Sequence, residues 1–125
     1  EPLSAIDEVF DPHAVKVVLD KLSYALYFSR ARIPWSRQHF SNDQASSQMP
    51  ELAAYHRHIG LYAYRVSFLN RYVELEVSPL EQLESLEQLR ALWHGEKIYM
   101  NEKIKKAGPG VDTPEDLERV RALMT

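Results

Sequence analysis

Two short apolar runs, joined by a tight polar connection, constrain the fold of this chain more than any other feature of its sequence. The first run covers residues 14–19 and is rich in β-branched side chains, and the second covers residues 24–29. Runs of about four to eight such residues, bounded by turn-forming residues, are typical of buried strands. The connection, Asp20-Lys21-Leu22-Ser23, is short enough to join antiparallel neighbours. The sequence therefore predicts a β-hairpin.

Leucine at every third position from Leu80 to Leu92 predicts two short helices rather than one long one. At about 100° per residue, an apolar stripe with this spacing drifts around a helix by about 60° at each step. A single straight helix would spread these leucines over most of its surface. We therefore expect a break near Glu84 and Ser85.

Two capping boxes support this division. Ser78 with Glu81 has the spacing of the first, and Ser85 with Gln88 has the spacing of the second. The second helix would bury a stripe of four residues: Leu86, Leu89, Leu92 and Trp93. Glu87 and Gln88 would then lie in a first helical turn, off that buried stripe.

Further elements complete an α/β fold with a mixed sheet and flanking helices. Residues 57–64 alternate as a strand does, which would place His58, Gly60, Tyr62 and Tyr64 on one face. Residues 66–72 are predicted to form a helix, and residues 97–104 another strand. A last helix would begin at Thr113 and bury four side chains: Leu117, Val120, Leu123 and Met124.

Composition narrows the classes of function. The chain has 125 residues, a net charge of -3 and no cysteine, so it suits one globular domain without disulfides. No basic stripe indicates nucleic acid as a partner, and no apolar run approaches the roughly 20 residues that span a bilayer. The first residue is Glu1 rather than Met, and we expect a piece of a longer protein.

Polar side chains at two places are candidate ligand-binding groups. His58 and Tyr62 flank Gly60, where the missing side chain leaves room for a ligand against the backbone. A core histidine and a surface tyrosine would look the same. Glu87 and Gln88 at a helix start suit a polyhydroxylated ligand, although plain capping and a solvated face explain them equally well.

Two charged residues are also candidates. Arg30 follows an apolar strand and could bind a carboxylate with its guanidinium fork, or simply be a surface charge. Asp112 precedes a helix and could hold Mg²⁺ as one of a pair of carboxylates, or cap the turn. Together, an anion fork, hydroxyl-binding groups and one metal ligand would suit an acidic sugar and a nucleoside triphosphate.

Several stretches resemble the CMP-Kdo synthetases, or 3-deoxy-manno-octulosonate cytidylyltransferases. They lie at residues 14–18, 24–30, 33–35, 57–65, 83–90 and 110–117. The most specific are Leu86-Glu87-Gln88-Leu89-Arg90 and Gly110-Val111-Asp112-Thr113-Pro114. The resemblance implies the C-terminal part of a nucleotide-diphospho-sugar transferase fold. It also implies transfer of CMP from CTP to Kdo, an eight-carbon acidic sugar, with release of pyrophosphate for lipopolysaccharide or capsule synthesis.

The resemblance assigns roles by position. The sugar-binding residues would be Arg30, His58, Tyr62, Glu87 and Gln88. Arg30 would face the sugar carboxylate, and Asp112 would be one of two aspartates that bind Mg²⁺. No catalytic residue is assigned within the chain.

The resemblance also implies that residues 1–125 are the sugar-binding and dimerisation half of one cytoplasmic cytidylyltransferase domain. The absent N-terminal half would carry the nucleotide site, so this piece alone is expected to be inactive. A homodimer is expected, partly because the loop Ile33-Pro34-Trp35 would expose a large aromatic ring. Two alternatives stay open: a non-catalytic sugar-binding and dimerisation fragment, and a sibling transferase for another acidic sugar such as sialic acid. Arg32, where the family suggests a smaller residue, and the polar stretch 41–48 depart from the resemblance.

Overall fold

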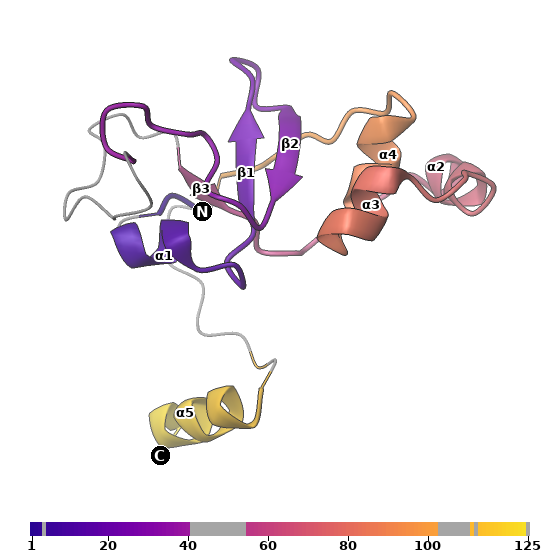
Figure 1. Cartoon of the computed structure of the whole chain (residues 1–125). Coiled ribbons are helices and arrows are strands. Elements are labelled where there is room, and N and C mark those ends of the chain that lie inside the picture. The colour runs from indigo at the N-terminus through magenta and orange to yellow at the C-terminus, as the bar shows by residue number, and fades with distance from the viewer. Residues whose placement is uncertain (4, 41–54, 103–110, 112, 125) are drawn as a thin grey trace.

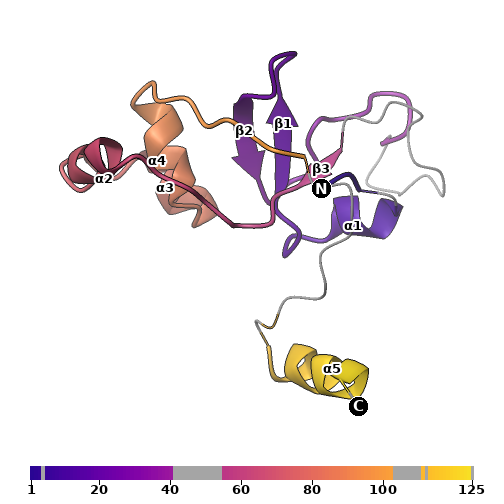
Figure 2. The ribbon, with the colours of Figure 1, turned by 180° about the vertical axis from the view of Figure 1, so that it is seen from behind.

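The computed structural model describes residues 1–3, 5–40, 55–102, 111 and 113–124. A small sheet lies at its centre, with α1 on one side and the helical region α2–α4 on the other (Figure 1). Seen from behind, α3 and α4 lie between the sheet and α2 (Figure 2). The elements in chain order are α1 (Ile6–Phe10), β1 (Lys16–Leu19), β2 (Ala25–Ser29), β3 (His56–Arg57), α2 (Val66–Tyr72), α3 (Pro79–Glu84), α4 (Gln88–Trp93) and α5 (Pro114–Met124).

The predicted hairpin is confirmed as β1 and β2, which pair antiparallel with Val17 opposite Phe28. The Asp20 carboxylate closes the connection by accepting the backbone N–H groups of Leu22 at 2.8 Å and Tyr24 at 2.9 Å. The strand β3 pairs antiparallel with the other edge of β1, which gives the order β2-β1-β3. The described strands thus form an antiparallel sheet flanked by helices, within the predicted α/β class.

The predicted break between two helices is also confirmed. The helix α3 starts at a cap in which the Ser78 hydroxyl accepts the N–H of Glu81 at 3.1 Å. It ends because Ser85 adopts a left-handed conformation with φ 52°, which lets the N–H of Leu86 reach the Glu81 carbonyl at 3.3 Å. The second capping box is wrong, because Ser85 takes the left-handed conformation that terminates α3. The N-cap of α4 is Glu87, without a side-chain cap.

Burial along α4 differs from the predicted stripe. Leu89 is fully buried and Leu86 is nearly so, as expected, but Trp93 is 54% exposed. Gln88, predicted to lie off the stripe, is only 5% exposed. The buried residues of α4 are Gln88, Leu89 and Ala91, because this side of the helix meets the sheet, and Trp93 lies at its rim.

Two apolar clusters form the core. The larger joins the hairpin to α4 and consists of Val17, Ala25, Phe28, Leu86 and Leu89. The smaller joins α1 to the segment before β3 and consists of Leu3, Val9, Phe40 and Tyr55. The sheet therefore connects a helix on one side to a helical pair on the other.

The segment predicted as a strand at residues 97–104 runs along β2 but forms a single bridge, Tyr24 to Tyr99, within its described part. The N–H of Ala25 donates to the Ile98 carbonyl at 2.9 Å. Ile98 and Met100 pack against the larger cluster, as their alternation predicts, while Tyr99 is exposed. Residues 103–104 lie outside the described residues.

The strand predicted at residues 57–64 is wrong beyond Arg57. Gly60 adopts φ 85°, a left-handed conformation that ends the extended course of the chain. The chain then leads into α2 over the predicted residues 66–72. The alternation of apolar and polar residues over 57–64 therefore predicted a strand where the chain turns at Gly60.

The helix α5 starts as predicted, because Thr113 and Asp116 exchange hydrogen bonds between side chains and backbone at 3.1 and 3.2 Å. The predicted burial of its stripe is wrong, since Leu123 is 70% exposed and Leu117 is also exposed. Figure 1 shows α5 apart from the other elements, so none of them covers its apolar side. No helix among the described residues is long and apolar enough to cross a membrane.

We predict that the two neighbouring leucines of α3 and α4 differ sharply in their contribution to stability. Leu89→Ala removes a fully buried side chain from the larger cluster and should lower the free energy of unfolding by about 2–5 kcal/mol. Leu83→Ala is the matched control, because Leu83 is 83% exposed, and should change it by less than about 0.5 kcal/mol. Urea unfolding measures both, and equal effects would contradict the described packing.

Candidate functional site

A continuous row of aromatic rings runs from the sheet to α2. Neighbouring ring centroids are 5.1 to 5.8 Å apart. The members of this aromatic row, in spatial order, are Phe28, His58, Tyr62, Tyr64, Phe68 and Tyr72. At its far end the guanidinium of Arg90 lies 4.8 Å from the centre of the Tyr72 ring, a cation–π contact. Most of α2 is exposed, so these stacking contacts hold it in place.

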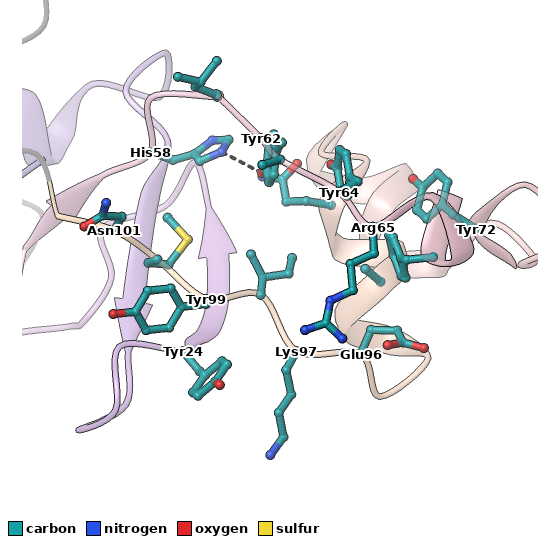
Figure 3. A pocket seen from close by; sticks show the side chains of 18 of the residues that line it. Tyr24, His58, Tyr62, Tyr64, Arg65, Tyr72, Glu96, Lys97, Tyr99 and Asn101 are labelled. Carbon is teal, nitrogen blue, oxygen red and sulfur yellow. Dashed lines mark hydrogen bonds between the residues drawn. The ribbon is translucent and has the colours of Figure 1, made fainter. Parts of the chain in front are cut away.

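His58 and Tyr62 come together because the chain turns at Gly60. Tyr62 Oη and His58 Nε2 share a hydrogen bond of 2.7 Å, drawn in Figure 3. Burial lowers the pKa of His58 to about 4, so the ring is neutral at pH 7. Burial also raises the pKa of Tyr62, which therefore keeps its proton. The pair thus offers neutral hydrogen-bonding groups between apolar rings.

Gln88 is the most unusual polar residue of the site. Its side chain is buried, and its Nε2 has no hydrogen-bond partner among the described residues. It lines the same groove as His58 and Tyr62. A buried amide without an acceptor is destabilising by about 1–3 kcal/mol, so its presence points to a ligand that supplies the acceptor.

The corner between α3 and α4 is fixed by charged groups. The Arg90 guanidinium donates to both carboxylate oxygens of Glu81, at 2.8 and 2.7 Å, and these hydrogen bonds hold the pKa of Glu81 below its usual range. The Tyr72 hydroxyl donates to the Glu87 carbonyl at 2.9 Å. The start of α4, with Glu87 and Gln88, is therefore tied to both neighbouring helices.

His58, Tyr62, Tyr64, Tyr72 and Gln88 line an open groove with a volume of about 1650 Å³. In Figure 3, the segment that carries His58, Tyr62 and Tyr64 forms one wall, and the segment from Glu96 to Asn101 forms the other. Arg65 extends from the first wall toward the second. The groove therefore combines aromatic surface, neutral hydrogen-bonding groups and three arginines, Arg57, Arg65 and Arg71.

Arg30 lies at the same end of the sheet but does not line this groove. Lys16 pairs with Ser29 on one side and with Arg57 on the other, so Arg30 and His58 follow on either side of Val15. With strands about 4.8 Å apart, their backbones are roughly 10 Å apart. Arg30 and His58, both predicted to bind the sugar, thus lie at one end of the sheet, and their roles stay predictions.

The Arg30 guanidinium is already partly engaged. Its Nε donates to the Glu84 carbonyl at 2.8 Å and its Nη1 to the Pro12 carbonyl at 3.2 Å. Within the described part of the chain, Nη2 makes no hydrogen bond. If Arg30 binds an anion, it would therefore do so through Nη2, at the tip of the guanidinium group, and not through Nε.

The proposed metal ligand Asp112 lies outside the described residues. Among the residues that the structure describes, no group of three or more histidines and carboxylates could hold a metal ion.

Sequence reasoning missed Lys16 and Glu84, which both contact Arg30. Lys16 stands inside an apolar strand run, and a lysine at such a position is the signal that could have found it. Glu84 was noted only as part of a helix break, since nothing local in the sequence shows that its carboxylate meets β2.

The fold and the groove define part of an α/β ligand-binding protein, and comparison with known proteins specifies the class. A model of the cytidylyltransferase family matches residues 1–98. This is well over half of the chain, which therefore belongs to the cytidylyltransferase family.

Individual relatives agree with this assignment. The chain is 57% identical over 122 residues to the 3-deoxy-manno-octulosonate cytidylyltransferase of Idiomarina loihiensis, which covers 98% of this chain and 47% of that protein. It is 53% identical over 121 residues to the protein of the same name from Coxiella burnetii, with 97% and 47% covered. A solved structure of CMP:2-keto-3-deoxy-manno-octonic acid synthetase complexed with CTP superimposes with a TM-score of 0.82 at 45% identity. It covers 98% of this chain and 46% of the solved one. The chain thus spans about half the length of the relatives it matches.

We predict that His58 stays neutral well below pH 6. Because burial places its pKa near 4, below the value of about 6.5 for an exposed histidine, the unfolded chain binds more protons between these values. The contribution of His58 to the free energy of unfolding therefore falls as pH falls through this window. An NMR titration of the ring, assigned with His58→Asn, measures the midpoint. A midpoint near 6.5 would contradict the buried environment.

Proposed function

We propose that the whole protein is a cytoplasmic cytidylyltransferase that transfers CMP from CTP to Kdo for lipopolysaccharide or capsule synthesis. Membership of the cytidylyltransferase family and the names of relatives that are 53–57% identical support this proposal. The same names favour Kdo over sialic acid. The structural observation that carries it is the buried Gln88 amide, which lines a groove beside His58 and Tyr62 and has no acceptor among the described residues.

The chemistry is an in-line displacement at phosphorus. The anomeric hydroxyl oxygen of Kdo attacks the α-phosphorus of CTP, the bond to the bridging oxygen of the departing pyrophosphate breaks, and the hydroxyl proton is lost. Such reactions depend on positioning of the two substrates and on stabilisation of charge. This chain would contribute by holding the sugar.

The groove offers groups suited to a polyhydroxylated acid. The neutral His58–Tyr62 pair can exchange hydrogen bonds with hydroxyls, and the Gln88 amide nitrogen can donate to one. Glu87 is exposed next to Gln88 and can accept from hydroxyls. Arg30, through its free Nη2, would bind the sugar carboxylate. Burial of the Gln88 amide excludes water from its contact and strengthens it.

The nucleotide site would lie in the N-terminal half of the whole protein, for which the half-length coverage of the relatives leaves room. We propose that Asp112 helps to bind Mg²⁺ there, together with a carboxylate from that other half. Bound Mg²⁺ would neutralise the triphosphate charge. The described residues do not complete such a site, so no step is derived through the metal.

The direct test is pyrophosphate release from CTP by the whole protein, with and without Kdo. The proposal expects release that requires Kdo and stops when EDTA removes Mg²⁺. Sialic acid in place of Kdo should give no release. Release with sialic acid but not with Kdo would assign a sibling transferase, and no release with either sugar would reject the proposed activity.

We predict that Gln88→Met separates stability from sugar binding. Methionine fills a similar volume without a buried donor, so the free energy of unfolding should stay equal or rise by about 1 kcal/mol. The KM for Kdo should rise about tenfold or more, because a hydrogen bond to the sugar is lost, while the KM for CTP should stay unchanged. Gln82→Met, at an exposed position of α3, is the control and should change neither quantity. Unchanged Kdo kinetics in Gln88→Met would remove Gln88 from the sugar site.

We also propose that the whole protein is a homodimer that covers α2 and the segments beside it. Trp35, which packs against Phe40 of the smaller cluster, remains 55% exposed. The helix α2, on the other side of the sheet, has no buried residue. The exposed apolar side chains of this region are Leu61, Val66, Leu69, Val73 and Val77. Apolar surface of this extent is typical of a subunit contact. In a symmetric dimer, this surface of each copy would pack against the same surface of the other copy.

The prediction is a mass of two copies by light scattering at micromolar concentration. Val73→Glu places a charge on this surface and should shift the mass toward one copy. Leu22→Glu, at a similarly exposed site in the hairpin connection, should leave the dimer intact. A mass of one copy for the unchanged protein would contradict the proposed dimer.

A further inference from the structure

Lys16 is a fully buried lysine in the middle of the sheet, a position that lysine rarely takes. Its ammonium donates to two main-chain carbonyls, those of Asp11 and Arg30, each at 2.7 Å. Burial lowers the pKa of Lys16, and the nearby charges of Asp11 and Glu84 oppose that effect. Burying a cation is costly, so its retention here calls for a specific role.

Glu84 approaches the same place from the end of α3. Its carboxylate accepts the hydroxyl of Ser29 at 2.6 Å and the backbone N–H of Arg30 at 3.0 Å. Its main-chain carbonyl accepts Arg30 Nε at 2.8 Å. The two residues thus meet at the end of β2, one from the central strand and one from a helix.

The result is an arginine held at four points. Its N–H and its Nε are fixed by Glu84, its carbonyl by Lys16, and its Nη1 by the Pro12 carbonyl at 3.2 Å. Because the guanidinium is planar, fixing Nε and Nη1 also fixes the direction of Nη2. Asp11 and Pro12 are adjacent in the chain, so the bond from Lys16 to Asp11 also steadies the carbonyl that receives Nη1.

We propose that Lys16 and Glu84 are positioning residues that aim the free Nη2 edge of Arg30 at the carboxylate of the acidic sugar. This inference rests on the proposed function and deepens it. Neither side chain touches the substrate; each acts through Arg30. Apolar residues often replace buried charged groups without loss of stability, so a variant of either residue can be expected to fold. If Lys16 and Glu84 had only a structural role, such a folded variant would bind the sugar as well as the unchanged protein does.

The first test needs no activity. In ¹H–¹⁵N spectra of the whole protein, the Arg30 Nε–H signal, assigned by its loss in Arg30→Lys, should exchange slowly with solvent. In Lys16→Met its exchange should accelerate about tenfold or more, because the Arg30 backbone is released. Val17→Ala is the matched control: it weakens the neighbouring core position but does not touch Arg30, so the signal should keep its exchange rate. Unchanged exchange in Lys16→Met would overturn the proposal.

The second test is kinetic. Lys16→Met should raise the KM for Kdo by about ten- to a hundredfold, with the KM for CTP unchanged, whereas Val17→Ala should change neither. In an Arg30→Ala background, Lys16→Met should have no further effect on the KM for Kdo, because its target is gone. Additive effects of the two substitutions would show that Lys16 does not act through Arg30.

A second variant covers the case in which Lys16→Met does not fold. Glu84→Gln keeps the size and one acceptor oxygen, and it should accelerate Arg30 Nε–H exchange and raise the KM for Kdo less strongly. No effect on either quantity would again reject the proposal. If the unchanged protein releases no pyrophosphate with Kdo, the proposed function fails, and the exchange measurement still decides whether Lys16 and Glu84 hold Arg30.

Discussion

The packing of α4 against the hairpin is the contact on which the rest of the structure depends. Leu89 packs with Phe28 and Val17 in one cluster, and this joins the sheet to the helical region. The same contact brings Gln88 into the lining of the groove. It depends in turn on Ser85, whose left-handed backbone ends α3 and lets α4 start in a new direction. Ser85 therefore determines where α4 places both Leu89 in the core and Gln88 in the groove.

Local signals in the sequence predicted the elements that local chemistry decides. The hairpin followed from two apolar runs and the Asp20 connection, and the helix break followed from a leucine spacing that one helix cannot bury. The cap at Thr113 was also visible, because a capping box lies within four residues. Each of these features is settled by neighbours in the chain.

The errors arose where distant packing decides the outcome. Gly60 can adopt either an extended or a left-handed backbone, and the alternation of residues 57–64 predicts only the extended one. The buried arc of α4 is set by the sheet it meets, which the spacing of leucines alone does not show. The stripe of α5 was predicted to be buried because it is apolar, but no described element packs on it.

In the site, too, some residues were predictable from the sequence and the contacts that support them were not. The types of residue named from the sequence, His58, Tyr62 and Gln88, do line one groove. What the sequence did not reveal is the supporting structure: the stacked rings that hold α2 and the buried Lys16 and Glu84 around Arg30. The contacts of Lys16 and Glu84 with Arg30 join residues 14 and 54 positions apart, for which no local pattern exists. The resemblance to a family supplied the roles, and the structure supplies the geometry by which they can be tested.

The central claim is that the groove over Gln88 binds the acidic sugar. The most direct measurement is the ¹H–¹⁵N signal of the Gln88 side-chain amide in the whole protein as Kdo is added. Because this amide has no acceptor among the described residues, a sugar hydroxyl that supplies one should shift its signal saturably, while the amide of exposed Gln82 stays unchanged. A Gln88 signal that does not move at saturating Kdo would contradict the account.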